Sequence, residues 1–235
     1  MFAPELLPGV QSAFESLCAQ AGITLVVPPE IDSLCCATPW SSKGMTRGYD
    51  TMSARVIPAL LTASDNGRLP IICDASSCTE GLIKMLATAD STESSCGAPN
   101  RHPLQIIDAV QFTAEHILPT LGPLPKVPSI TLHPTCSSTQ LGLNPYLTTL
   151  AKAVATQVNI PIDAGCCAFA GDRGMLHPEL TYAATRPEAA EVESLDADVH
   201  ASCNRTCELG MTRATGRPYR HILEVLADAV ASAPI

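Results

Sequence analysis

Short apolar runs alternate along this chain with longer segments in which apolar residues recur at helical spacing. ITLVV at 23–27 and PIICD at 70–74 have the length and the β-branched content of buried strands. The pattern predicts strands over 23–27, 70–74, 129–133, 157–161 and 198–201, and helices over 4–21, 50–65, 105–118, 139–156, 178–195 and 219–232. Strands that alternate with helices are typical of parallel βαβ units, so we expect an α/β fold.

A proline-rich segment divides this pattern into two parts. LGPLPKVP at 121–128 holds three prolines in eight residues, a composition typical of a linker. The segment 91–103 is rich in Ser, Gly and Pro and is predicted to be a loop within the first part. The order of strands and helices is similar on both sides of the linker. We therefore expect two similar half-domains with short parallel sheets, over 1–120 and 129–235, related by a pseudo-twofold axis.

Composition and charge narrow the possible functions. The chain has 235 residues, of which 46% are hydrophobic and 16% are charged, as in a globular protein with a sizeable core. A net charge of −9 argues against a nucleic-acid partner, which requires a basic surface. No apolar run approaches the roughly 20 residues of a membrane helix, and the N-terminus lacks the cationic start of a signal peptide. We expect a cytoplasmic protein, with a peripheral place at the inner face of the membrane as the alternative.

The cysteines repeat between the two halves. Each half has two adjacent cysteines followed by a looser pair: Cys35–Cys36 with Cys73 and Cys78, and Cys166–Cys167 with Cys203 and Cys207. The interval from Cys36 to Cys73 is 37 positions, and that from Cys167 to Cys203 is 36 positions. The repeat predicts that each half gathers its thiols at one point.

Disulfides explain this arrangement poorly. The count of 11 cysteines is odd, so at least one thiol cannot pair within the chain. Neighbouring residues have Cα atoms about 3.8 Å apart, whereas disulfides usually need about 4.4–6.8 Å. Metal binding or redox chemistry is therefore favoured over structural bridges. Cys18 and Cys96 lie outside the repeat and can equally be small buried hydrophobic residues.

The second half offers the fuller set of metal ligands. Its candidates follow three different predicted strands: Cys136, Cys166, Cys167, Cys203 and Cys207. The carboxyl ends of parallel strands are where ligands bind in open α/β sheets. Iron–sulfur clusters are commonly held by four cysteine thiolates, so this set is sufficient. Zinc is the competing metal, but it favours C-x2-C spacing, which the chain lacks. His133, at the end of a predicted strand, could donate a hydrogen bond to a cluster sulfur or simply end the strand.

In these motifs the chain resembles the cysteine-rich (CCG-type) domains of iron–sulfur oxidoreductases, and in particular the C-terminal region of FAD-linked D-lactate dehydrogenases. The resembling segments are LCCATPWSSKG at 34–44, CDASSCT at 73–79, HPTCSSTQLGL at 133–143, GCCAFAGDRGMLHPELT at 165–181 and SCNRTCELGMTRATGRPYR at 202–220.

The resemblance implies an iron–sulfur electron-transfer domain or subunit of a flavin-dependent D-2-hydroxy-acid (D-lactate-type) dehydrogenase. It implies a cluster of the 4Fe-4S type in the chain and FAD on a partner domain or subunit. The chain has no G-x-G-x-x-G fingerprint, and we assign it no FAD-binding and no catalytic residue.

Two departures from the family pattern affect this interpretation. The glycine that usually follows the adjacent pair is Ala37 in the first half and Ala168 in the second, which could crowd a tight turn. The family pattern also places a cysteine about thirty residues before the first pair, near residue 5, where the sequence reads APELL. We therefore expect an N-terminally truncated first half-domain with an incomplete site at Cys35, Cys36, Cys73 and Cys78, and a complete second site.

Other functions remain open on the sequence. The chain could be a non-catalytic docking subunit or a truncated remnant of such an enzyme, since the flavin domain and one expected cysteine are missing. Thiol–disulfide catalysis is a further alternative, but it requires an exposed thiolate with a lowered pKa.

Overall fold

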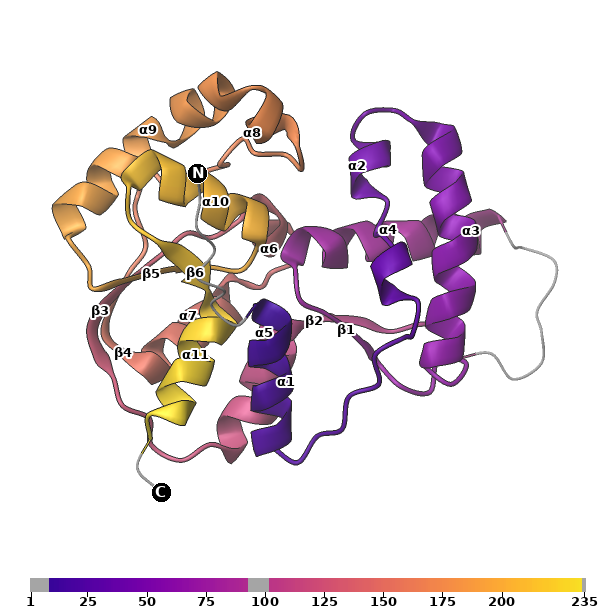
Figure 1. The fold of residues 1–235 in the computed structure, drawn as a ribbon, viewed down its shortest axis with the longest axis horizontal. Helices are drawn as coiled ribbons and strands as arrows, with labels where there is room; N and C mark the ends of the chain where they lie inside the picture. The colour runs from indigo at the N-terminus through magenta and orange to yellow at the C-terminus, as the bar shows by residue number, and fades with distance from the viewer. Residues whose placement is uncertain (1–8, 93–101, 234–235) are drawn as a thin grey trace. The chain divides into compact units, whose positions relative to one another are not determined.

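The computed structural model describes residues 9–92 and 102–233, and its contacts divide the chain into two compact units (Figure 1). One unit takes the chain up to Thr24 and again from Ala109; we call it the four-stranded unit. The other, the two-stranded unit, is Leu25–Asp108. This division differs from the half-domains 1–120 and 129–235, because the helix α1 packs against the last helix of the chain. The half-domains stay a prediction about a repeat in the sequence.

The four-stranded unit is an α/β fold with a parallel sheet, as predicted. Its strands are β3 (Val127–Leu132), β4 (Ala155–Asn159), β5 (Val199–Ser202) and β6 (Tyr219–His221). Its helices are α1 (Val10–Gln20), α5 (Ala109–Phe112), α6 (Cys136–Gln140), α7 (Asn144–Val154), α8 (Arg173–Leu176), α9 (Pro178–Leu195), α10 (Arg205–Thr215) and α11 (Ile222–Ala231), with short helical turns at Thr113–Ile117 and Leu118–Thr120. The strand order is β4-β3-β5-β6, and every neighbouring pair is parallel.

This order creates a switch point between β3 and β5. From β3 the chain moves to β4 on one side, and it then crosses over to β5 and β6 on the other side. Figure 1 shows the consequence: α7 and α11 lie on one side of the sheet, and α9 and α10 lie on the other. The connections at such a point diverge and leave room for ligands beyond the carboxyl ends of the strands.

The two faces of this sheet are packed differently. On the α7 side the contacts are apolar, because α7 buries residues at helical spacing: Leu147, Leu150, Ala151 and Val154. On the other side α9 buries three polar residues and one apolar one: Thr181, Thr185, Glu188 and Val192. The sheet presents a polar row across its four strands, made of the paired residues Asn159, Thr131, His200 and Tyr219. The rings of His200 and Tyr219 lie 5.3 Å apart within this row. The interior between the sheet and α9 is therefore largely polar.

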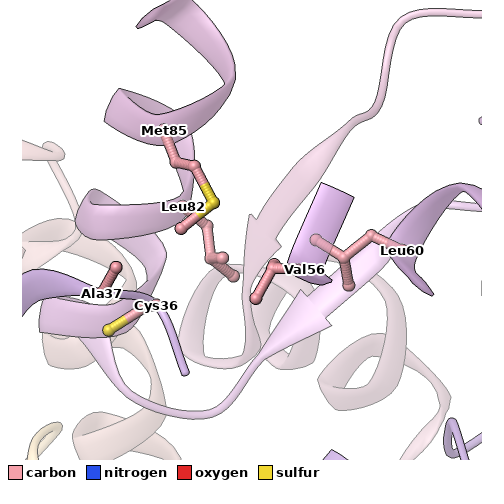
Figure 2. Close-up of a cluster of buried hydrophobic side chains, with 6 residues drawn as sticks. All are labelled: Cys36, Ala37, Val56, Leu60, Leu82 and Met85. Carbon is pink, nitrogen blue, oxygen red and sulfur yellow. The ribbon is translucent and has the colours of Figure 1, made fainter. Parts of the chain in front are cut away.

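The two-stranded unit is smaller and is built around helices. Its strands β1 (Ile71–Cys73) and β2 (Ile106–Asp108) are parallel, and its helices are α2 (Thr38–Ser41), α3 (Thr46–Ala63) and α4 (Ser76–Thr92), with a short turn at Ile31–Ser33. Figure 2 shows its buried cluster, which consists of Cys36, Ala37, Val56, Leu60, Leu82 and Met85. The cluster joins α3 and α4 to the turn before α2. A cysteine of the first pair is thus part of the core of this unit.

The structure corrects several predictions of secondary structure and adds two helices. The run 23–27 forms no strand, because it carries the chain from one unit to the other, and Val26 and Val27 are exposed to solvent. The segment 105–118 begins as β2 rather than as a helix, since Ile106 and Ile107 pair with β1. The segment 219–232 likewise begins as the strand β6, which pairs with β5, and its helix α11 starts at Ile222. Residues 76–92 and 205–215 form helices that the pattern did not indicate.

Most of the predicted loop 91–103 and the position near residue 5 lie outside the described residues. Within the described part of the chain, no helix combines the length and the apolar character needed to cross a membrane.

Candidate metal centre

The connection after β3 presents Cys136 at the start of a fixed helix. Thr135 caps α6: its Oγ1 accepts a hydrogen bond of 2.9 Å from Ser138 N, and the Ser138 hydroxyl accepts one of 2.9 Å from Thr135 N. This reciprocal cap satisfies two backbone groups at the helix start. Cys136 is the first residue of α6 and its side chain is exposed. Its thiol is therefore held at the carboxyl edge of the sheet and open to solvent.

The connection after β4 carries the adjacent cysteines on a strained turn. Ala168 has a φ of 54° and Ala170 has a φ of 41°, a region that favours glycine. The turn directs the Ala168 N–H toward Cys166 Sγ, at 3.3 Å. Phe169 is fully buried beneath it. The turn thus places a backbone N–H donor beside the Cys166 sulfur and packs the ring of Phe169 against Cys167.

The connection after β5 supplies the last two cysteines. Cys207 lies in the first turn of α10, where its sulfur accepts a hydrogen bond of 3.5 Å from the Asn204 side-chain amide. Cys203 is buried at the end of the strand, with Thr135 Oγ1 3.9 Å from its Sγ. All three connections therefore bring thiols to one edge, and we call Cys136, Cys166, Cys167, Cys203 and Cys207 the Cys166–Cys167 site.

The thiols of this site form hydrogen-bonded pairs that favour thiolates. Cys167 Sγ lies 3.2 Å from Cys207 Sγ. The hydrogen bond with Cys207, aided by His133 against the effect of burial, lowers the pKa of Cys167 to about 5. The hydrogen bond with Cys136 lowers the pKa of Cys166 to about 6. The pKa values of the partners Cys136 and Cys207 are raised, since each pair retains one proton.

A histidine lies beside the buried pair. His133 is fully buried at the end of β3, and its Nδ1 is 2.7 Å from Glu188 Oε1 on α9. One ring nitrogen of His133 and the sulfurs of Cys167 and Cys207 all lie within 4.8 Å of one another. Burial lowers the pKa of His133, but interactions with the Cys167 and Glu188 side chains outweigh it and raise the pKa to about 9. The sequence analysis left two roles open for this histidine, and the structure places it beside the thiols.

The four remaining candidates gather in the two-stranded unit; we call Cys35, Cys36, Cys73 and Cys78 the Cys35–Cys36 site. Cys36 Sγ lies 3.2 Å from Cys78 Sγ, and Cys78 also hydrogen-bonds with Cys73. The hydrogen bond with Cys78 lowers the pKa of Cys36 to about 6. Burial, together with the neighbouring charge of Cys36, raises the pKa of Cys35. Figure 2 shows the Cys36 sulfur at the side of the buried cluster.

The two sites share local structure that sequence reasoning missed. Each adjacent pair is followed by an alanine at positive φ, with 60° at Ala37 and 54° at Ala168. In each unit a helical glycine lies against this turn. A Cβ on Gly81 would lie 2.2 Å from Thr38 Oγ1, and one on Gly210 would lie 3.3 Å from a ring carbon of Phe169. The signal was present in the sequence as C-x2-G, in CTEG at 78–81 and CELG at 207–210.

The chemistry of these donors suits a metal or an iron–sulfur cluster. A tetrahedral metal ion bound at about 2.3 Å holds two thiolate sulfurs about 3.8 Å apart. The 3.2 Å between Cys167 and Cys207 is close to that spacing and well beyond a disulfide bond. Thiolates must form before a metal binds, and the site lowers the pKa of both adjacent cysteines. The residues present therefore fit such a group.

A comparison with known families agrees with this assignment. Residues 130–212 match the family model of the cysteine-rich domain CCG. The matched segment is about a third of the chain and contains the whole Cys166–Cys167 site. No curated protein sequence matches the chain. The family match and the site geometry together support a cysteine-rich, metal-binding domain of the kind found in oxidoreductases.

Proposed function

We propose that the chain is the iron–sulfur electron-transfer domain or subunit of a flavin-dependent D-2-hydroxy-acid dehydrogenase of the D-lactate type. FAD would reside on a partner domain or subunit. The observation that carries the proposal is the gathering of five thiols from three connections at the switch point of a parallel sheet, within the segment that matches the cysteine-rich domain. The resemblance of the surrounding motifs supports the specific enzyme class.

The residues of the Cys166–Cys167 site would have different roles in binding the cluster. Cys136, Cys166, Cys167 and Cys207 are the principal ligands in this proposal, and Cys203 is an alternative or fifth ligand. A bound iron–sulfur cluster supplies one-electron transfer at a potential that hydrogen bonds and solvent exposure adjust.

Groups around these ligands could adjust the reduction potential of the cluster. The Ala168 N–H and the Asn204 amide donate hydrogen bonds to sulfur, which stabilises negative charge there. Phe169 keeps water from the buried side of the site. Cys136 and Cys166 are exposed, so electrons would enter or leave at that side.

The Cys35–Cys36 site is proposed as a second metal site. Its support is the chain of hydrogen bonds that joins its four thiols and the lowered pKa of Cys36. Four thiolates are the number that an iron–sulfur cluster or a structural zinc ion commonly uses.

Metal analysis tests the proposal. The protein is purified without oxygen, and iron, zinc and acid-labile sulfide are measured per chain. The proposal expects a brown protein with iron and sulfide in similar amounts. A colourless protein that contains only zinc contradicts it.

The alternative function is a docking subunit that holds a flavoprotein partner and passes no electrons. Its support is that the chain itself carries no FAD fingerprint. The double variant C166A/C167A separates the two functions. Unchanged turnover of the partner, with intact binding, favours docking, whereas lost turnover with intact binding favours electron transfer.

A further inference from the structure

His133 has a free ring nitrogen where a metal would bind. The side chain is fully buried, and its Nε2 makes no hydrogen bond with the described residues. A buried polar nitrogen without a partner destabilises the fold, so such atoms normally have a function or a missing ligand. One ring nitrogen of His133 lies within 4.8 Å of the sulfurs of Cys167 and Cys207.

The other ring nitrogen is fixed as in known metal sites. Nδ1 lies 2.7 Å from Glu188 Oε1, and the Glu188 side chain is 2% exposed. Metal-ligating histidines almost always place their second nitrogen on a carboxylate or carbonyl, which sets the tautomer and orients the ring. Glu188 projects from the polar inner face of α9, where a buried carboxylate is costly unless it is partnered. The pair therefore has the arrangement of a ligand and its supporting carboxylate.

The same unit contains histidines that lack this arrangement. His200 and His221 are also buried and also have an Nε2 without a hydrogen bond. Among the described residues, however, only His133 joins two cysteines in a group compact enough to bind a metal ion. Burial alone therefore does not distinguish His133; its position beside the thiols does.

We propose that His133 is a nitrogen ligand of the metal centre at the Cys166–Cys167 site, and that Glu188 is its positioning residue. The inference rests on the proposed function only for the presence of a metal there. It makes the site a mixed nitrogen and sulfur site. Replacing a thiolate by a neutral imidazole removes negative charge, and in clusters this raises the reduction potential.

Pulsed EPR with labelled histidine tests this directly. The protein is produced with ¹⁴N- or ¹⁵N-histidine, purified without oxygen and reduced, and nitrogen couplings to the cluster are recorded. We expect a coupling of the strength of a bound imidazole that changes with the label. It disappears in His133→Ala and remains in His200→Ala, the matched buried control. Glu188→Gln retains the coupling but lowers metal retention about 10-fold or more.

Several results would overturn the inference. One is a wild-type cluster with no histidine coupling, or with only the weak coupling that a hydrogen bond to sulfur gives. Another is a coupling that survives in His133→Ala. If the variants do not fold, the labelled wild type still shows whether a histidine is bound. Among the described residues, His133 is the histidine that lies in a compact group with two cysteines.

X-ray absorption separates this inference from the proposed function. If the metal is zinc, the iron–sulfur proposal fails, and the zinc edge then shows whether imidazole is bound. Imidazole scattering in the wild type that is lost in His133→Ala upholds the inference, and a spectrum with sulfur scattering alone overturns it.

Discussion

The Cys35–Cys36 site and the Cys166–Cys167 site share a scaffold but differ in charge. Both place adjacent cysteines before an alanine at positive φ, and both pack a helical glycine against that turn. In the four-stranded unit the pKa of both adjacent cysteines is lowered. In the two-stranded unit the pKa of Cys36 is lowered, whereas that of Cys35 is raised. A repeated backbone therefore does not ensure repeated chemistry.

The neighbours of each pair explain the difference. Cys166 has the thiol of Cys136 as a hydrogen-bond partner, and Cys167 has the thiol of Cys207. His133 lies near Cys167 and lowers its pKa further. At Cys35 burial is the largest effect and raises the pKa, with a smaller contribution from the charge of Cys36. Cys166 also lies beside a charged neighbour, but its hydrogen bond with Cys136 outweighs burial and that charge. The two sites also differ two residues after the pair, where Thr38 contacts the Cys36 sulfur at 3.4 Å but Phe169 presents an apolar ring.

The largest expected difference between the two units is in how their stability responds to acid pH. His221 is buried in the four-stranded unit, and burial lowers its pKa to about 3, whereas the only histidine of the two-stranded unit, His102, is exposed. The unfolded chain binds the extra proton below about pH 6.5, so His221 makes the four-stranded unit less stable as the pH drops from about 6.5 to 3. His221 alone contributes a slope of about 1.4 kcal/mol per pH unit. Burial raises the pKa of Glu208 in the same unit to about 7, and this opposes the slope of His221 between about pH 7 and 4.5. Hydrogen exchange of the metal-free protein, followed for each unit, measures the slope.

His221→Asn provides the control, because asparagine can still cap α11 but does not titrate. The part of the slope that His221 contributes, about 1.4 kcal/mol per pH unit between about pH 6.5 and 3, should disappear in this variant. An unchanged slope would mean that another group controls the acid response.

Alanine at the two packed glycines should affect the two units unequally. Gly81→Ala places a Cβ 2.2 Å from Thr38 Oγ1 and 3.2 Å from the Cys36 carbonyl, so we expect a loss of about 1–3 kcal/mol. Gly210→Ala meets nothing closer than 3.3 Å, and the better helix propensity of alanine should nearly offset that contact. Urea unfolding measures both. Thr38→Ala should reduce the cost of Gly81→Ala, and equal costs at both glycines would contradict this account of the turns.

Alkylation should distinguish the first cysteine of each pair. At pH 7 in the metal-free protein, Cys166 should react about 10-fold faster than Cys35, because its thiolate is already formed. The rate at Cys166 should level off above about pH 6, whereas the rate at Cys35 should rise beyond pH 9. Mass spectrometry of iodoacetamide-treated protein measures the extent of alkylation at each cysteine. Identical pH profiles of the alkylation rate at Cys166 and Cys35 would contradict the proposed difference in charge between the two sites.

Replacing the two strained alanines by glycine should change the stability of the protein least. Ala168→Gly relieves a positive φ at a half-buried position and should stabilise the metal-free protein by about 0.5–1 kcal/mol. Ala37→Gly relieves similar strain but removes a fully buried methyl group, so we expect little net change. Thermal unfolding measures both, and destabilisation by Ala168→Gly would show that the strain is not real.

Two elements of the four-stranded unit lie at or close to their predicted positions. The helix over 178–195 has the predicted bounds, and the strand over 198–201 is found one residue further on, as β5. The position of the cysteines after strands also follows from sequence order, because parallel strands bring their carboxyl ends to one edge.

What the sequence could not indicate depends on tertiary contacts. The strand expected at 23–27 is absent because no described strand pairs with this segment. The local pattern of hydrophobic residues cannot indicate whether such a partner exists. The helices α4 and α10 begin within cysteine-rich segments, where the sequence analysis expected no helix. The partner of His133 is Glu188, 55 positions further along the chain, so the pair appears only after folding.

The central claim is that the Cys166–Cys167 site holds an iron–sulfur cluster. The most direct measurement is the iron and sulfide content and the EPR signal of C166S/C167S beside its matched control C35S/C36S, both purified without oxygen. The account predicts that C35S/C36S keeps the cluster signal of the Cys166–Cys167 site and that C166S/C167S loses it together with its iron and sulfide. Full iron, sulfide and signal in C166S/C167S, or none in the wild type, would contradict the account.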